Sequence, residues 1–501
     1  MGDHLDKLRT RLADVHNLER ASAVLTWDQH TYMPPAGAAA RGEQMATLSR
    51  LAHEIFTDPR TGELLAASAR EVADLPPDGD DARLVRLARR QYDRAVKVPP
   101  ALVSEMRKHA AVANPIWVRA RQENDFASFE PCLGKTVQLS REMAEHLGYE
   151  DSVYDALLQE FEPGMKTSQV RAIFDALKPD LVELVAAISE RLDLVDDSVL
   201  HQPFDEAGQE AFGRMVVERF GYDFSRGRQD RTVHPFEITF SRNDVRITTR
   251  FEPDFLSPAL FGTLHEGGHG MYEQGVGESL DGTMLGRGTS LGFHESQSRL
   301  WENVVGRSRP LWQHFYPHLQ RAFPGQLGDT DLETFYKAIN KVQPSFVRVE
   351  ADEVTYNLHI MLRFEMEIDM LEGRFPVSEA PAVWNQKMDD YLGIRPPTDS
   401  LGILQDIHWS GGMLGYFSTY SLGNITSVQL YDRAVQEVPD IPEQIARGRF
   451  EGLHGWLTDR IYRHGSKFEP NELIQRVTGE PLQSRSYLAY LRRKYGEIYE
   501  L

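Results

Sequence analysis

Residues 257–271 read Ser-Pro-Ala-Leu-Phe-Gly-Thr-Leu-His-Glu-Gly-Gly-His-Gly-Met. Serine followed by proline favours a helix start, with Ser257 as the N-cap and Pro258 as the first helical residue. Apolar residues then continue past both histidines, so the pattern predicts one helix through this stretch. His265 and His269 are four residues apart, which places them one turn apart on the same helix face, where both imidazoles can reach one ion.

Glu266 follows the first histidine directly, so its side chain is turned about a quarter-circle round the helix. There it can hold an activated water without ligating the ion, which is the arrangement of a zinc metallopeptidase. The bare pattern would arise by chance in roughly one chain in twenty of this length. Gly267 and Gly268 each cost a helix about 1 kcal/mol relative to alanine. We interpret them as clearance above the metal for a peptide.

A catalytic zinc takes three protein ligands and leaves one position for water. The best candidate for the third ligand is Glu295, which follows His269 after a glycine-rich stretch that fits a loop between two helices. The alternative for Glu295 is a solvated glutamate on a helix surface. The adjacent His294 is either a partner of a ligand or a rival ligand.

Composition sets limits on the function. The chain has 501 residues, 41% apolar and 26% charged, which is typical of a soluble globular protein without a membrane span. The formal net charge of −20 opposes binding to nucleic-acid backbones. The N-terminus does not read as a secretory signal, and the one cysteine, Cys132, cannot form an internal disulfide. We therefore expect a cytoplasmic protein.

Most of the sequence has the periodicity of helix, and the apolar stripe of Leu5, Leu8, Leu12 and Val15 is one example. Residues 236–240 and 245–249 instead alternate with period two about a turn at 241–244, which predicts a β hairpin. The hairpin either offers an edge to a substrate backbone or only buttresses the histidine helix. The fold class is therefore mainly α, with a small sheet beside that helix.

Several ordered motifs resemble those of the carboxypeptidase Taq family of metallocarboxypeptidases, the thermostable carboxypeptidase 1-like enzymes, and the resemblance runs nearly end to end. Besides the histidine helix, the matching segments are Trp27–Pro34, His234-Pro235-Phe236, Asp244–Thr248, His294–Gln297, Arg348–Asp352 and Gly402–Trp409. Ser418 departs from the pattern, because the family usually has proline there.

The resemblance implies a mostly helical, two-lobed body with a deep groove, formed by residues 1–501 as a single metallocarboxypeptidase unit with its metal-site core at about 230–425. It implies a homodimer that removes single residues from the free C-termini of peptides. The implied metal ligands are His265, His269 and Glu295, and the implied general base is Glu266. One Zn²⁺ per chain is expected, with Co²⁺ or Mn²⁺ as substitutes.

The resemblance also points to Tyr420 and His234 as donors to the oxyanion, although a tyrosine in an aromatic run is often packing and a histidine before proline is often a turn residue. A carboxypeptidase needs a cation that reads the terminal carboxylate, and a guanidinium does this best. Arg348 is the first candidate and His408 the second. The structural alternative for Arg348 is an ion pair with Asp352, four residues on.

Tyr416 and Arg246 complete the expected substrate-binding set, although Arg246 is more simply explained as an ion pair with Asp244. Two alternatives to a carboxypeptidase remain. One is an oligopeptidase or dipeptidase that cuts in the same groove, and the other is a non-catalytic helical scaffold with a structural metal. The intact Glu266 argues against the scaffold, because a structural site has no need of a base. No nucleic-acid or membrane partner is expected.

Overall fold

The computed structural model describes residues 2–501, and these form 21 α-helices and one three-stranded sheet, which confirms the predicted mainly helical class. Contacts divide the chain into two compact units. Unit 1 comprises residues up to 96, 197–339 and 430–480, and unit 2 comprises residues 97–196, 340–429 and 481–501. The boundary near residue 430 falls within one helix, α17 (Ser418–Glu437).

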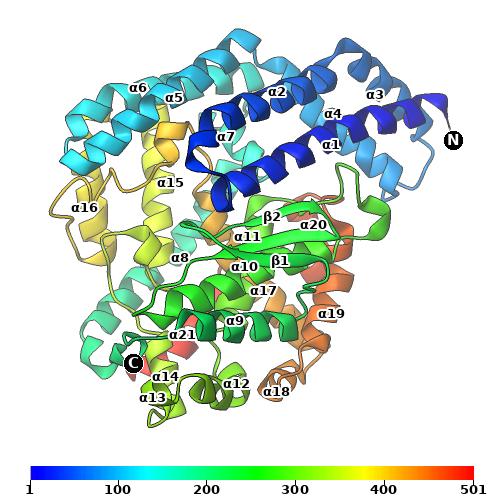
Figure 1. Ribbon diagram of the computed structural model, residues 1–501. Helices are drawn as coiled ribbons and strands as arrows, with labels where there is room; N and C mark the ends of the chain where they lie inside the picture. The colour runs from blue at the N-terminus through cyan, green and yellow to red at the C-terminus, as the bar shows by residue number, and fades with distance from the viewer. Residues whose placement is uncertain (1) are drawn as a thin grey trace. The chain divides into compact units, whose positions relative to one another are not determined.

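Unit 1 contains the sheet and most of the helices (Figure 1). Its helices are α1 (Asp3–Thr31), α2 (Ala38–Thr57), α3 (Pro59–Glu71), α4 (Asp80–Lys97), α9 (Glu206–Phe220), α10 (Leu256–Gln274), α11 (Leu291–Arg299), α12 (Arg309–Ala322), α13 (Pro324–Leu327), α14 (Leu332–Ile339), α18 (Ile441–Ala446), α19 (Glu451–Arg460) and α20 (Pro470–Thr478). The predicted apolar stripe is buried along α1, where Leu5, Leu8 and Leu12 join a core cluster with leucines of α3 and α4.

Among the described residues, unit 2 contains helices and loops and no strand. Its helices are α5 (Pro100–Glu123), α6 (Phe126–Leu147), α7 (Val153–Phe161), α8 (Thr167–Ser189), α15 (Tyr356–Glu372), α16 (Ala380–Leu392) and α21 (Arg485–Tyr499). α15 is buried along nearly all its length and carries polar side chains inward, among them the fully buried Arg363 and Glu367. A helix that buries such groups must supply them with hydrogen-bond partners.

The sheet has the strand order β1 (Gly227–Arg231), β3 (Asp244–Thr249), β2 (Glu237–Ser241). β2 and β3 pair antiparallel, which confirms the predicted hairpin within one residue at each strand boundary. β1 pairs parallel to β3 and was not predicted, since its sequence Gly-Arg-Gln-Asp-Arg lacks apolar alternation. Arg20 on α1 donates to the Thr239 carbonyl of β2 at 2.5 Å, so part of this strand is already bonded within unit 1.

The histidine helix α10 begins at Leu256, with Phe255 as the extended residue before it and no side-chain cap. The prediction that Ser257 caps this helix is therefore wrong, because Ser257 already lies in the first turn. A short antiparallel bridge between Glu252 and Phe255 holds the entry instead. The strand β3 lies against α10 in the middle of unit 1 (Figure 1).

The two glycines of α10 serve helix packing, which corrects their interpretation as clearance for a peptide. A Cβ on Gly268 would lie 2.6 Å from the Gln297 carbonyl oxygen and 2.8 Å from the Ser298 Cα, both backbone atoms of α11. A Cβ on Gly267 would lie 2.9 Å from Cγ1 of Val217 on α9. The missing side chains let α9 and α11 approach α10 closely, and this approach brings α11 to the histidines.

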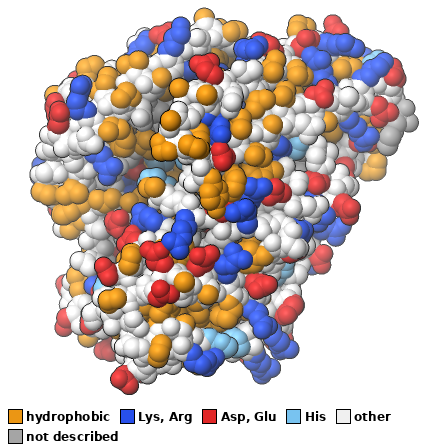
Figure 2. All heavy atoms as spheres, in the orientation of Figure 1, with side chains coloured by type: hydrophobic (Ala, Val, Ile, Leu, Met, Phe, Trp, Pro, Cys, Tyr) orange, Lys and Arg blue, Asp and Glu red, His pale blue; other side chains and the backbone are white. Residues whose placement is uncertain are grey.

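No described helix combines the length and the low charge that crossing a bilayer requires. On the face shown in Figure 2, acidic and basic side chains are mixed, with small groups of hydrophobic side chains between them. The negative charge of the chain is therefore not gathered into one patch on that face.

Candidate metal centre

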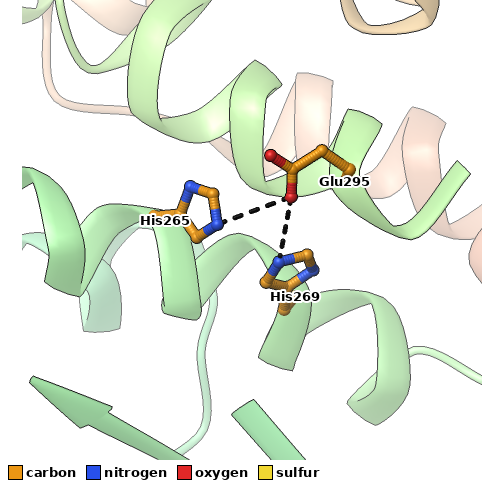
Figure 3. Close-up of side chains that lie close together, drawn as sticks. All are labelled: His265, His269 and Glu295. Atoms are coloured by element: carbon orange, nitrogen blue, oxygen red, sulfur yellow. Dashed lines mark ion pairs between the residues drawn. The ribbon is translucent and has the colours of Figure 1, made fainter. Parts of the chain in front are cut away.

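Three side chains of unit 1 converge on one point (Figure 3). His265 and His269 project from neighbouring turns of α10, and Glu295 projects toward them from α11. Oε2 of Glu295 lies 3.6 Å from Nε2 of His265 and 3.5 Å from Nε2 of His269. Among the described residues, this is the only group of histidine, cysteine and acidic side chains whose ligand atoms come close enough together to hold an ion.

The donor set and its spacing fit a divalent metal ion. Two ligand atoms at about 2.1 Å from an ion, separated by the tetrahedral angle, lie about 3.4 Å apart. The two measured separations, 3.6 Å and 3.5 Å, are close to that value and longer than a direct hydrogen bond would favour. Two imidazoles and one carboxylate with room for water form the ligand set of a catalytic zinc site.

A second carboxylate orients His265. Nδ1 of His265 lies 2.8 Å from Oε2 of Glu302, and since a carboxylate only accepts, the ring donates its Nδ1 proton. In the neutral ring this leaves a lone pair on Nε2, which faces Glu295. Glu302 lies in a π-helical turn, Leu300–Val305, that continues α11, and Gly306 N donates to Trp301 O with the five-residue spacing of such a turn. π turns of this kind are frequent at functional sites.

His269 is oriented by another histidine. Its Nδ1 lies 2.5 Å from Nδ1 of His294, whose Nε2 lies 2.9 Å from Oε1 of the buried Glu273. When His294 is neutral, it donates its Nε2 proton to Glu273 and accepts the Nδ1 proton of His269. Nε2 of His269 then keeps its lone pair toward Glu295. Of the two roles predicted for His294, this geometry favours the partner of a ligand.

Carboxylates dominate the electrostatics around the three side chains. Burial disfavours the charged form of His265, but Glu295 and Glu302 outweigh it and raise its pKa to about 9. Burial lowers the pKa of His269 to about 3. Burial also opposes the charged form of Glu295, yet Arg299 and the two histidines bring the pKa of this carboxyl well below its usual range. The site thus keeps an ionised carboxylate ready for a cation.

Glu266 is buried beside the histidine pair, with 6% of its surface exposed. Burial raises the pKa of its carboxyl to about 7, against the opposing effect of His265. A general base is most effective when its pKa lies near the working pH, so this carboxyl has the proton affinity that such a role requires.

Unit 2 contains a separate cluster around Arg348 and Asp406. Nε and Nη2 of Arg348 donate to Oδ1 of Asp406 at 3.1 and 2.8 Å, and Nη1 donates to the Tyr356 hydroxyl at 2.9 Å. The structural alternative for Arg348, an ion pair with Asp352, is absent, because residues 348–350 form only a 3-10 turn and Ala351 is extended. Asp352 instead accepts the backbone N–H groups that follow it, including that of Thr355.

A second guanidinium shares the same carboxylate. Nε of the fully buried Arg363 donates to Oδ2 of Asp406 at 2.6 Å, and its Nη2 donates to Gln405 at 2.7 Å. Burial opposes ionisation of Asp406, but Arg363 and Arg348 bring its pKa well below the usual range. Asp406 thus balances one of the two positive charges that it touches.

Aromatic side chains line this cluster. The ring centroid of Tyr416 lies 5.3 Å from those of both His408 and Tyr420, and the guanidinium carbon of Arg348 lies 5.2 Å from the Tyr420 ring. Burial lowers the pKa of His408 to about 4, so this imidazole is neutral at pH 7. Burial raises the pKa of Tyr420, which keeps its hydroxyl proton available. Four predicted site residues of unit 2 therefore lie together.

The two remaining predicted site residues belong to unit 1 and are not among its three converging side chains. Arg246 forms a two-point ion pair with Asp244 at 2.8 and 2.9 Å, as its simpler explanation predicted, and its guanidinium stacks over Trp27 at 4.3 Å. His234 is exposed in the loop between β1 and β2. Their roles in substrate binding and catalysis stay predictions.

Sequence reasoning did not assign Glu302, Glu273 or Arg363. The spacing of Glu302, seven residues after Glu295, was the available signal, because residues at that separation lie near one face of a helix. The sequence did not mark Arg363 as a site residue, since a charged residue in an apolar helix is ordinarily expected on the solvent-exposed face of that helix.

Comparison with known proteins agrees with this arrangement. The family model described as carboxypeptidase Taq (M32) metallopeptidase matches residues 7–495. The chain is 42% identical to thermostable carboxypeptidase 1 of Thermus thermophilus over 492 residues, covering 96% of each. It is 38% identical to carboxypeptidase 1 of Bacillus subtilis over 490 residues, covering 98% of this chain and 97% of that protein.

Solved structures show the same relation. The M32 carboxypeptidase of Deinococcus radiodurans R1 superposes with a TM-score of 0.96 at 40% identity, covering 100% of both chains. The Pyrococcus furiosus carboxypeptidase superposes with a TM-score of 0.95 at 35% identity, covering 99% of both. The chain therefore belongs to the carboxypeptidase Taq (M32) metallopeptidase family, as its motifs predicted, and is a metallocarboxypeptidase.

Proposed function

We propose that the chain binds one Zn²⁺ through His265, His269 and Glu295 and removes single residues from the free C-termini of peptides. The observation that carries the proposal is the convergence of these three ligand atoms beside the buried carboxyl of Glu266. Co²⁺ and Mn²⁺ suit the same ligands, so supply in the cell decides among them.

When bound, the metal ion would lower the pKa of a water molecule and polarise the scissile carbonyl. Glu266 then acts as the general base. Its carboxylate accepts a proton as the water oxygen bonds to the carbonyl carbon, and it returns that proton to the amine as the carbon–nitrogen bond breaks. The raised pKa of Glu266 suits both transfers at neutral pH.

The cluster in unit 2 is proposed to read the terminal carboxylate. Its two guanidiniums, Arg348 and Arg363, face one ionised carboxylate, Asp406, so an incoming anion would complete the charge balance. We assign the direct contact to Arg348, with His408 and Tyr416 as further substrate-binding residues. Asp406 and Gln405 hold the two guanidiniums in place.

Tyr420 and His234 are the proposed donors to the oxyanion, and Tyr420 has the firmer support because its phenol keeps its proton. Arg246 is proposed only as a secondary contact to substrate, since Asp244 already balances its charge, whereas Asp406 balances only one of the two guanidiniums that it touches. Loss of an oxyanion donor typically slows turnover by about 100-fold or more.

Two assays test the proposal. Mass spectrometry of one unblocked peptide and its C-terminally amidated twin should show single-residue steps from the C-terminus of the free peptide alone. Glu266→Gln should retain stoichiometric metal and lose turnover, whereas Glu278→Gln, at an exposed position, should match the wild type. Internal cuts or equal cleavage of the amidated peptide would instead support an oligopeptidase. Substantial hydrolysis by Glu266→Gln would exclude it as the base.

We further propose a homodimer in the cytoplasm. The support for this location is the single cysteine, Cys132, which leaves the chain without an internal disulfide. The homodimer is supported by the family resemblance, and sedimentation velocity measures it directly.

A further inference from the structure

Glu367 is a buried carboxyl that the proposed reaction does not use. It lies in α15 and none of its surface is exposed. A carboxyl in such a place costs free energy unless hydrogen bonds replace those it made with water. The groups that supply these bonds indicate its role.

Three donors converge on this carboxyl. Oε1 accepts from the indole Nε1 of Trp409 at 2.8 Å, and Oε2 accepts from the Tyr154 hydroxyl at 2.8 Å and from the Gly415 backbone N–H at 3.0 Å. All three are uncharged. The nearby guanidinium of Arg363 is engaged by Asp406 and Gln405.

Two of these donors mark the ends of one short segment, residues 409–415, which begins within the 3-10 helix His408–Gly411 and is called the 409–415 turn. Trp409 opens the segment 409–415 and Gly415 closes it, so Glu367 holds both ends, one on each carboxyl oxygen. The turn needs glycine at Gly412 and Gly415, whose φ angles are +77° and +97°. A Cβ on Gly415 would lie 2.9 Å from the carbonyl carbon of Leu157, so α7 closes over this end of the turn.

The residues just outside the two ends are His408 and Tyr416, whose ring centroids lie 5.3 Å apart. Nδ1 of His408 lies 3.8 Å from Asp406, the carboxylate that holds Arg348. We infer that Glu367 is a positioning residue whose carboxyl fixes both ends of the 409–415 turn and so places the His408 and Tyr416 rings beside Arg348. The inference rests on the proposed function of this cluster as the reader of the terminal carboxylate.

Glutamine cannot replace this carboxyl fully. Its side chain has one acceptor oxygen, and its NH₂ group would face donors only. Glu367→Gln should therefore release one end of the turn while keeping the volume of the side chain. Trp409→Phe keeps the carboxyl and removes the indole donor at the Trp409 end, so it tests the same tether if Glu367→Gln folds poorly.

A matched control lies two residues away on the same helix. Glu365 also accepts from several donors, namely Lys178, Lys387 and the Tyr391 hydroxyl. None of these three donors belongs to the 409–415 turn. Glu365→Gln should therefore lose comparable interactions without moving the turn.

Steady-state kinetics with free C-terminal peptides and hydrogen exchange of the 408–416 segment together test the inference on the metal-loaded enzyme. For Glu367→Gln we expect KM to rise about tenfold with kcat within about twofold, the size expected for a misplaced binding contact. Exchange of the 408–416 segment should become faster. Trp409→Phe should likewise raise KM and speed exchange of the 408–416 segment, whereas Glu365→Gln should change neither KM nor the exchange rate.

Arg348→Ala in the same assay separates the two proposals. If Arg348→Ala raises KM while Glu367→Gln and Trp409→Phe do not, the positioning role is overturned and the carboxylate reader stands. If Arg348→Ala leaves KM unchanged, both are overturned. A rise in KM for Glu365→Gln equal to that for Glu367→Gln would show a general loss of packing, and it would also overturn the positioning role.

Discussion

Glu302 holds the His265 imidazole at one nitrogen, so that the neutral ring presents its other nitrogen toward Glu295. Glu302 accepts from its Nδ1 at 2.8 Å, and Arg299 and Arg307 lie within 4 Å of the same carboxylate. These cations keep Glu302 ionised, and burial alone would favour its neutral form. The protein therefore fixes the ring orientation before a cation arrives, which lowers the cost of binding it.

Removal of Glu302 should weaken metal binding rather than the chemistry itself. We expect Glu302→Ala to lower Zn²⁺ affinity about 10- to 100-fold, because the ring loses both its orientation and its preferred tautomer. Glu302→Gln should lose less, since the amide oxygen still accepts from Nδ1. Competition with a chromophoric chelator measures both, with Glu278→Gln as the control. An affinity equal to that of the wild type for Glu302→Ala would contradict this role.

Individual residues differed in how far the sequence could predict them. The i, i+4 spacing of His265 and His269 fixes their shared face by helix geometry alone, so their convergence was predictable. Partners that come from another element were not predictable. The approach of α11 to α10 depends on packing, and so does the assembly of the Arg348–Asp406 cluster within unit 2. Arg348 shows this limit, since its partner is Asp406, 58 residues away, and not the neighbour Asp352.

Helices α10 and α11 approach each other at glycine. Gly268 faces the backbone of α11, only two and three residues beyond Glu295, whereas Gly267 faces the Val217 side chain of α9. The same two residues that disfavour a helix therefore allow the packing that brings Glu295 to the histidines.

The two glycines should respond differently to alanine. In Gly268→Ala the added methyl meets backbone atoms at 2.6 and 2.8 Å, so α11 must move and carry Glu295 with it. We expect a loss of about 1–3 kcal/mol in unfolding free energy together with weaker metal binding. In Gly267→Ala only the Val217 side chain must move. A gain of about 1 kcal/mol in helix propensity offsets much of the strain.

Thermal unfolding and chelator competition distinguish the two variants. Gly267→Ala serves as the matched control, since it adds the same methyl to the neighbouring position. Wild-type metal affinity in Gly268→Ala would show that the close approach of α11 does not place Glu295.

Helix α15 should give the stability of the protein a pH dependence. Burial raises the pKa of Glu367 from 4.5 to about 7. Its three hydrogen-bond donors and the charge of Arg363 lower the pKa, but they offset the effect of burial only in part. The unfolded chain loses this proton near pH 4.5, whereas the folded chain keeps it until about pH 7. The stabilisation is thus fully present below pH 4.5 and is lost as the pH rises through 7, by about 3 kcal/mol at most.

Urea unfolding of the wild type and Glu367→Gln at pH 5 and pH 8 measures this effect. Other titrating groups cancel in the difference between the two proteins, so the wild type should lose stability relative to the variant at the higher pH. A difference that stays constant between pH 5 and pH 8 would mean that Glu367 keeps its ordinary pKa.

Each unit is assembled from three separate stretches of chain. Unit 1 joins residues up to 96 with 197–339 and 430–480, and one boundary falls within α17. Local patterns predicted the helices and the hairpin because periodicity is a local property. They could not predict this division, since no linker composition marks it and it depends on contacts between distant segments. The strand β1 was missed for the same reason, as its place in the sheet comes from pairing with β3.

All three predicted ligands lie in unit 1, so metal removal should affect that unit most. Without a cation, Glu266, Glu295 and Glu302 lie close together with only histidines and arginines to offset them. A ligand that binds only the folded state stabilises it by about 2.7 kcal/mol at one hundred times its Kd. We therefore expect a chelator to lower the Tm and to speed hydrogen exchange most within residues 256–306. Added Zn²⁺ should reverse both changes, and Glu295→Ala should not respond to the chelator. If the chelator sped hydrogen exchange of residues 356–392 as much as that of residues 256–306, the stabilising effect of the metal would not be confined to unit 1.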